Sequence, residues 1–133
     1  MNLFVDTSVW SLALRRDTPT GGAEVAHLTE ALEGGAQVFT TGLVLQELLQ
    51  GFFEPRNRQA VIERFGALPF LVPDRRDHVD AADLRNQCRK HGLRVTTIDA
   101  LLAQLCIRHD LAMLTADKDF AAIAEIHPLR LRI

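Results

Sequence analysis

Short apolar runs alternate with longer amphipathic segments along this chain. The runs are typical of strands buried within a sheet, whereas the longer segments repeat apolar residues at the spacing of a helix face. Strands are predicted at residues 3–5, 37–40, 68–72, 111–114 and 129–133. Helices are predicted at residues 9–14, 23–33, 41–52, 55–66, 74–91, from 96 onward, and 121–125. The alternation predicts an α/β fold, a three-layer α/β/α sandwich with a central, mainly parallel sheet of about five strands.

Turn and capping residues mark the ends of several of these elements. Pro69 and Pro73 flank the third predicted strand, which is typical of a strand at a sheet edge. Asp74 and Asp77 occupy the two positions of a capping box at the start of the next helix. Residues 15–22 contain the run Thr-Pro-Thr-Gly-Gly and are predicted to form a loop.

The length and composition are those of one globular domain. The chain has 133 residues, 47% apolar and 24% charged, without a repeat or linker, so we expect a single domain over residues 1–133. No apolar run reaches the ~18 residues that a membrane span needs. The N-terminus lacks a basic segment and a cleavage site, so secretion is not indicated. Cys88 and Cys106 lack metal-ligand spacing and indicate buried, reduced thiols in a cytoplasmic protein.

Four acidic residues stand near strand ends or helix starts: Asp6, Glu47, Asp99 and Asp117. Because right-handed crossovers make the strands parallel, the elements that follow strands begin at one edge of the sheet, where ligands bind in such folds. Each residue also has a simpler interpretation. Asp6 and Asp117 are suitable helix N-caps, Asp99 stands in capping-box position after Thr96, and Glu47 could be a solvated surface residue. Taken together, the four favour a shared acidic site.

Carboxylates that converge in this way repel one another. At ~4 Å and an effective dielectric constant of ~20, each pair costs about 4 kcal/mol unless a proton or a cation is bound. An all-oxygen site without His or Cys selects a hard ion such as Mg²⁺ or Mn²⁺, which activates water and neutralises phosphate charge. The formal net charge of −2 argues against a constitutive basic platform for nucleic acid. If four of the 17 acids lie in one metal site, the other 13 face 15 Lys and Arg, which permits a phosphate-bearing partner. Metal-assisted hydrolysis of a phosphodiester is the predicted chemistry.

The same acids lie in four short motifs that resemble those of a known family. The motifs are Val-Asp-Thr-Ser at 5–8, Gln-Glu at 46–47, Thr-Ile-Asp-Ala-Leu-Leu-Ala at 97–103 and Leu-Thr-Ala-Asp-Lys-Asp-Phe at 114–120. Their order and spacing are similar to the acidic motifs of the PIN domain and, more narrowly, of the VapC-type toxins of bacterial toxin–antitoxin pairs. The resemblance implies a PIN-like fold and a cytoplasmic, Mg²⁺- or Mn²⁺-dependent endoribonuclease. It also implies an RNA substrate, a homodimer and a cognate antitoxin protein that blocks the site.

Roles for individual residues follow from the resemblance. It implies that the catalytic metal ligands are Asp6, Asp99 and Asp117, with Glu47 holding a metal-bound water or a second ion. Thr7 and Thr115 would orient these carboxylates, and Asp119 would be an auxiliary acid, with helix capping or surface exposure as its alternatives. Candidate phosphate contacts, each with a solvated surface role as the alternative, are Arg15, Arg16, Lys118, Arg75 and Arg76.

Three other interpretations compete with a nuclease. A response-regulator receiver needs an acidic pair after its first strand and a Lys after its last, and neither is visible. A haloacid-dehalogenase-like phosphatase needs a second Asp where this chain has Ser8. A catalytically silent PIN-like module that binds RNA or a protein stays open, and Leu49, Phe52 and Phe53 could form a docking groove for a partner or pack into the core.

Overall fold

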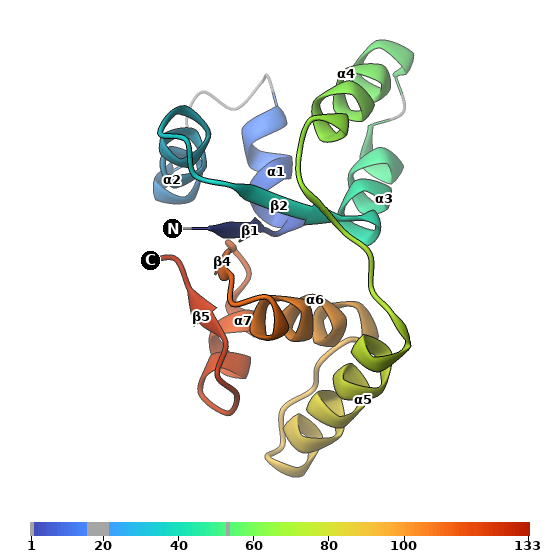
Figure 1. Cartoon of the computed structure of the whole chain (residues 1–133), viewed down its shortest axis with the longest axis vertical. Coiled ribbons are helices and arrows are strands. Elements are labelled where there is room, and N and C mark those ends of the chain that lie inside the picture. The colour runs from blue at the N-terminus through green and yellow to red at the C-terminus, as the bar shows by residue number, and fades with distance from the viewer. Residues whose placement is uncertain (1, 16–21, 53) are drawn as a thin grey trace.

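Five parallel strands form one sheet in the computed structural model, which describes residues 2–15, 22–52 and 54–133 (Figure 1). The spatial order is β3-β2-β1-β4-β5, with β1 pairing in parallel with both β2 and β4. The strands are β1 (Leu3–Val5), β2 (Val38–Thr41), β3 (Phe70–Leu71), β4 (Ala112–Leu114) and β5 (Arg130–Leu131). The predicted parallel sheet is confirmed, and the proline-flanked strand β3 lies at its edge as expected.

Helices cover both faces of this sheet, which confirms the predicted three-layer arrangement (Figure 1). One layer contains α1 (Thr7–Leu14), α2 (Gly22–Glu33), α3 (Gly42–Gly51) and α4 (Pro55–Gly66). The other layer contains α5 (Arg75–Lys90), α6 (Thr97–Arg108) and α7 (Lys118–Ala124). Among the described helices, none combines the length and the apolar character needed to cross a membrane.

The core lies between these layers and explains the continuous apolar runs of the central strands. All three residues of β1 and of β4 are buried, because helices cover both faces of the strands. Above the sheet, the ring of Trp10 packs on Phe65 with 5.0 Å between ring centroids. Leu49 and Phe52 pack at the margin of this core, while Phe53 lies outside the described residues. Cys88 and Cys106 are free and buried, as the sequence predicts.

Element boundaries differ from the predicted ones where capping or pairing decides them. The edge strands β3 and β5 contain two residues each, fewer than the predicted 68–72 and 129–133, because each pairs with one neighbour only. Helix α7 begins at Lys118 instead of Ala121, because the carboxylate of Asp117 accepts a hydrogen bond from the backbone N–H of Asp119 and starts the helix there. Helix α1 likewise begins two residues earlier than predicted. The predicted loop 15–22 lies mostly outside the described residues.

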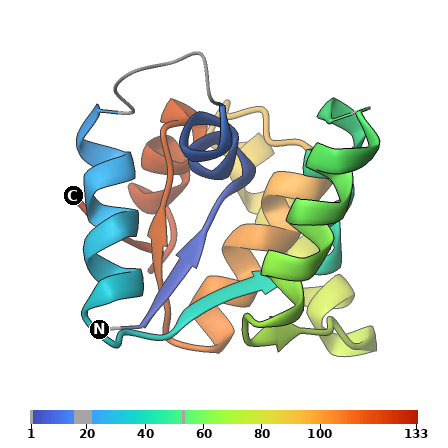
Figure 2. The ribbon, with the colours of Figure 1, turned by 90° about the horizontal axis from the view of Figure 1, so that it is seen from above.

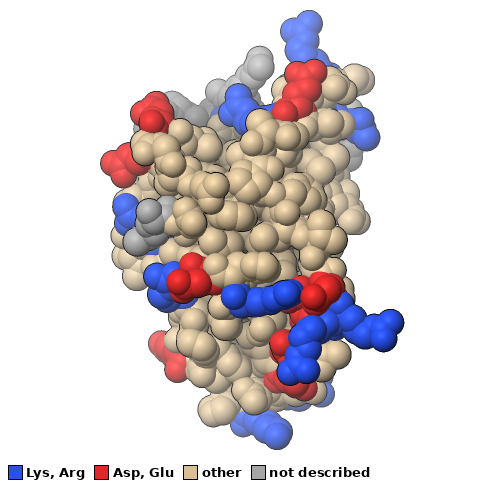
Figure 3. Space-filling model, viewed as in Figure 1, with Lys and Arg blue, Asp and Glu red and all other residues tan. Residues whose placement is uncertain are grey.

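An ion pair with one buried partner links α5 to α6. The predicted capping box of Asp74 and Asp77 is present, with backbone-to-carboxylate distances of 2.8 and 2.9 Å. Asp77 is fully buried and also accepts a hydrogen bond of 2.7 Å from Arg108 at the end of α6. Figure 3 shows basic and acidic side chains side by side over these two helices, with a largely uncharged region above them.

The strands end at a common edge of the sheet, which we call the carboxyl edge. In Figure 2 this is the upper edge, where β1 leads into α1 and where α7 and the connection between α5 and α6 also lie. Side chains far apart in the sequence therefore meet at this edge, as expected for parallel strands joined by crossover helices.

Candidate metal centre

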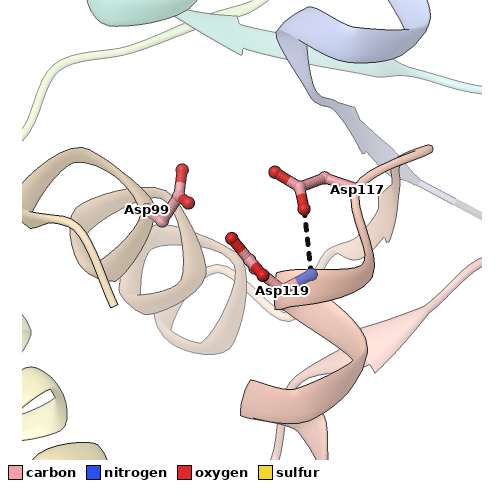
Figure 4. Close-up of side chains that lie close together, drawn as sticks. All are labelled: Asp99, Asp117 and Asp119. Carbon is pink, nitrogen blue, oxygen red and sulfur yellow. Dashed lines mark hydrogen bonds between the residues drawn. The ribbon is translucent and has the colours of Figure 1, made fainter. Parts of the chain in front are cut away.

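Three aspartates converge at the carboxyl edge (Figure 4). One carboxylate oxygen each from Asp99, Asp117 and Asp119 lies within 4.8 Å of the other two. Asp99 and Asp117 are half-buried, and Asp119 is exposed. Figure 4 shows the Asp99 carboxylate on α6 facing the other two across a narrow space, from the opposite side. Such a spacing allows one small cation to contact all three residues.

Local helix starts hold these aspartates in place. Asp99 lies in the first turn of α6, where its backbone N–H donates to the hydroxyl of the N-cap Thr96 at 3.0 Å. Asp117 is the N-cap of α7, and Asp119 lies in the first turn of that helix. Of the predicted capping roles for the acids, the structure shows that of the Asp117 side chain, whereas Asp6 makes no side-chain cap and α6 is capped by Thr96. An ionised carboxylate has two oxygens with about four acceptor positions, so one side chain can cap a helix and still bind a cation.

Asp6 approaches the same edge from β1 and is held by two hydroxyl groups. One of its carboxylate oxygens, Oδ2, accepts hydrogen bonds from Ser8 and from Thr115, both at 2.7 Å. These hydroxyls in turn accept from the backbone N–H groups of Ala116 and Asp117, at 3.0 and 2.9 Å. Since each hydroxyl has one proton, both protons are committed to Asp6. The network ties the end of β1 to the end of β4 and fixes the orientation of the Asp6 carboxylate.

Glu47 on α3 is held by a residue of α1. Its Oε1 accepts a hydrogen bond of 2.8 Å from the hydroxyl of Thr7, the residue next to Asp6. This hydrogen bond brings α3 to the start of α1, at the carboxyl edge. Thr7 and Thr115 therefore each donate a hydrogen bond to a carboxylate at this edge.

The charges at this edge act on one another. Burial, together with the nearby carboxylates of Asp117 and Asp6, raises the pKa of Asp99 to about 6, against a lowering hydrogen bond from Thr96. Burial, with a contribution from the charge of Asp6, also raises the pKa of Cys106 beneath the site, so this thiol stays protonated. The influence of Asp6 on both groups places it in the same electrostatic cluster as the three converging aspartates.

The group of acids that converge in the structure differs from the predicted set of metal ligands. Within the described residues, the three acids close enough to share one ion include Asp119, while Asp6 and Glu47 lie outside this group. The hydroxyl network accounts for the position of Asp6, because it directs Oδ2 towards Ser8 and Thr115. Ser8 is a residue of the site that sequence reasoning missed. Its place two residues after Asp6, inside the first motif, was the available signal.

The residues present fit a hard divalent ion. The three aspartates offer oxygen donors only, and in the described part of the chain none of them has a Lys, Arg or His within 4.0 Å to neutralise it. Oxygen-only sites of this kind suit Mg²⁺ or Mn²⁺.

The predicted phosphate contacts are dispersed. Lys118 lines a cavity next to the aspartates, whereas Arg76 pairs with an acid one turn later on α5 at 3.1 Å. Arg15 and Arg75 are exposed, and Arg16 lies outside the described residues.

Comparisons with known proteins agree with the fold. The family model described as PIN domain matches residues 3–126. Ribonuclease VapC11 of Mycobacterium tuberculosis is 30% identical over 130 residues, which is 96% of this chain and 96% of that protein. VapBC2 from Rickettsia felis, solved bound to a DNA fragment from their promoter, shares the fold with a TM-score of 0.77 and 19% identity, covering 99% of this chain and 98% of that one. VapC20 of M. tuberculosis, described as a sarcin-ricin loop cleaving toxin, has a TM-score of 0.68 at 19% identity, covering 91% and 94%.

Proposed function

Because this chain belongs to the PIN domain family, we propose that it is a divalent-metal-dependent endoribonuclease, the toxin of a VapC-type toxin–antitoxin pair. The observation that carries the proposal is the convergence of Asp99, Asp117 and Asp119 at the carboxyl edge without a cationic partner among the described residues. A relative of 30% identity over nearly the whole chain is named a ribonuclease, which supports the same reaction class.

The aspartates would hold the metal ion, and neighbouring groups would hold the aspartates. Asp99, Asp117 and Asp119 offer oxygens to one ion, and Asp6 adds negative charge beside them. Bound there, Mg²⁺ or Mn²⁺ supplies water activation and stabilises negative charge on the phosphate. Ser8 and the two threonines keep the carboxylates oriented, as outer-shell hydroxyls commonly do at metal sites.

Glu47 has a distinct place in this proposal. It accepts from Thr7 through Oε1, which leaves its second oxygen available. We assign to this oxygen the orientation of a water molecule or a second cation beside the metal site. The exposed position of Asp119 is compatible with direct access of an RNA strand to the three aspartates.

The partners are proposed from the same relatives. Structural neighbours include VapBC assemblies, so we propose that a small antitoxin protein binds this chain and blocks the site, and that the chain forms a homodimer. With RNA as the substrate, we expect the activity in the cytoplasm. The competing function, a silent module that binds RNA or protein, has no supporting observation of its own in this site.

The test is RNA cleavage by the purified protein. Total RNA is incubated with the wild type and with Asp6→Asn and Asp99→Asn variants, in Mn²⁺ or in EDTA, and new 5′ ends are mapped. We expect discrete cleavage by the wild type with Mn²⁺ only, and a loss of roughly 100-fold or more in each variant. An Asp83→Asn variant is the matched control, since Asp83 is exposed on α5. Wild-type cleavage rates in both site variants would show that the site is wrongly assigned, and no cleavage by any protein would favour the silent module.

A further inference from the structure

A surface cavity lined by arginines opens next to the N-cap of α6, the helix that carries Asp99. Its volume is about 520 Å³, and it lies between the last turns of α5 and the connection to α6. The charged residues that line it are all basic: Arg85, Arg89 and Arg94. In a chain of net charge −2, three arginines around one cavity form a local concentration of positive charge.

The three arginines are not used by the fold in the same way. Arg85 is half-buried, and its Nε donates a hydrogen bond of 2.7 Å to the backbone carbonyl of Val95. Arg89 stands one helical turn later on the same face of α5, and Arg94 lies on the connection to α6. Both are exposed, and neither pairs with an acid of the described chain within 4.0 Å. Arg85 thus anchors the wall, and the other two guanidinium groups are available to a ligand.

One residue, Thr96, links the lining of this cavity to the acidic site. Thr96 lines the cavity and is also the N-cap of α6, where its hydroxyl accepts from the backbone N–H of Asp99. Of the three arginines, Arg94 is the nearest in the sequence to a proposed metal ligand, five residues before Asp99. Figure 2 shows the connection between α5 and α6 at the same edge of the sheet as the start of α1 and α7.

A second cavity borders Asp117 and has a different character. It measures about 360 Å³, and its lining includes Asp117 and Glu24 as well as Lys118 and Arg132. Because its charges are of both signs, it offers no comparable attraction to an anion. Of these two cavities, the one lined by arginines suits a phosphate.

We propose that the arginine-lined cavity binds a phosphodiester group of single-stranded RNA, next along the strand to the group presented to the aspartates. This inference rests on the proposed function and adds a named subsite to it. The acids alone repel a polyanion, so a substrate needs fixed cations close by. Guanidinium groups bind phosphate oxygens in pairs of hydrogen bonds, which fixes the strand's position as well as attracting it.

The test measures binding without cleavage. A fluorescent single-stranded RNA oligonucleotide is titrated with protein in EDTA at a series of salt concentrations, and anisotropy gives the affinity. The variant is Arg89→Ala/Arg94→Ala, which leaves the Arg85 anchor intact. The matched control is Arg56→Ala/Arg58→Ala, which removes the same charge from two exposed positions on α4, in the other helix layer. Thermal unfolding of each protein checks that both pairs leave the fold intact.

We expect the cavity variant to bind RNA roughly tenfold or more weakly at low salt. The slope of log affinity against log salt should fall by about 0.7 for each phosphate group that the variant no longer neutralises. The control pair should keep most of the wild-type affinity and slope. Equal reductions of RNA affinity in the two variants, or no reduction in the cavity variant, would overturn the proposal. The cavity would then not be an RNA subsite, even if it binds another polyanion or a protein. The binding assay contains no free metal and therefore does not depend on cleavage. If the protein binds RNA in this way but never cleaves it, the proposed function is refuted and the phosphate subsite is retained.

Discussion

Replacing Asp99 by Asn should make the metal-free protein more stable. In the folded chain Asp99 has a pKa of about 6, because burial and the carboxylates of Asp117 and Asp6 disfavour its ionised form. The unfolded chain has an ordinary value near 3.8. At neutral pH the folded protein must therefore carry a charge that its surroundings oppose, and Asn has the same shape without this charge.

The size of the effect follows from the two pKa values. The difference between these pKa values corresponds to at most about 3 kcal/mol in the free energy of unfolding. Asp99 is only half-buried, so solvent screening reduces this to about 1–2 kcal/mol. For a domain of this length, each kcal/mol raises the melting temperature by about 3–5 °C. We therefore expect Asp99→Asn to melt several degrees higher than the wild type in EDTA at pH 7.5.

The pH dependence of stability independently checks whether Asp99→Asn stabilises or destabilises the fold. A carboxyl group whose pKa is raised by folding stabilises the fold fully below its unfolded value of 3.8, and this stability is lost as pH rises through about 6. The advantage of the variant should thus be absent near pH 3.8 and complete above pH 6. Thermal melts at a series of pH values in EDTA measure it, with Asp83→Asn as the control on an exposed surface. A variant less stable than the wild type at pH 7.5 without metal would refute this reasoning.

Three further substitutions separate the roles of neighbouring residues. Ser8→Ala removes one of two hydroxyls that hold Asp6 and leaves a backbone N–H without its partner, so denaturant unfolding should show a loss of about 1–2 kcal/mol. Ser8→Thr should recover most of the lost stability. Equal losses of stability in Ser8→Ala and Ser8→Thr would mean that the hydroxyl is not responsible. Arg108→Ala leaves the buried Asp77 without its cation and should lower the stability of the protein in urea, with the affinity for Mn²⁺ unchanged; a neutral effect on urea unfolding would contradict a stabilising role of this ion pair. Thr7→Val frees the Glu47 carboxylate and should lower RNA cleavage by about 10-fold with unchanged melting temperature, whereas full activity would exclude a positioning role.

Much of the fold could be predicted because its signals are local. The apolar runs, the prolines that flank β3 and the capping box at Asp74 are signals that each involve a few adjacent residues. The structure confirms the elements that they predict. The lengths of β3 and β5 could not be predicted in the same way, since pairing with a single neighbour determines them. The start of α7 was missed because two acids, Asp117 and Asp119, compete for the capping position, and only the folded chain shows which carboxylate accepts the bond.

The candidate site was predictable in its location but not in its inner arrangement. Parallel strands bring their ends to one edge, so the meeting of Asp6, Asp99 and Asp117 at the carboxyl edge followed from topology. The direction of each side chain did not follow. A hydroxyl 109 residues away, on Thr115, fixes the orientation of Asp6, and Asp119 takes the third place around the space that an ion could fill. Their roles as metal ligands remain predictions.

The arginine-lined cavity also could not be predicted from the sequence. In the sequence, Arg85 and Arg94 resemble ordinary solvated charges on a helix and a loop. They line one cavity in the folded chain, where the carbonyl of Val95 accepts a hydrogen bond from Arg85 and joins the connection to α5. Interactions of this kind depend on how two helices pack, which no local pattern encodes.

The most direct measurement of the central claim is a titration of the metal-free protein with Mn²⁺, followed by electron paramagnetic resonance. We expect the wild type to bind Mn²⁺ at the aspartates, with binding weakened at least about tenfold in Asp117→Asn and unchanged in Asp83→Asn. Equal Mn²⁺ affinity in all three proteins, or no binding by the wild type, would contradict a metal centre at the carboxyl edge.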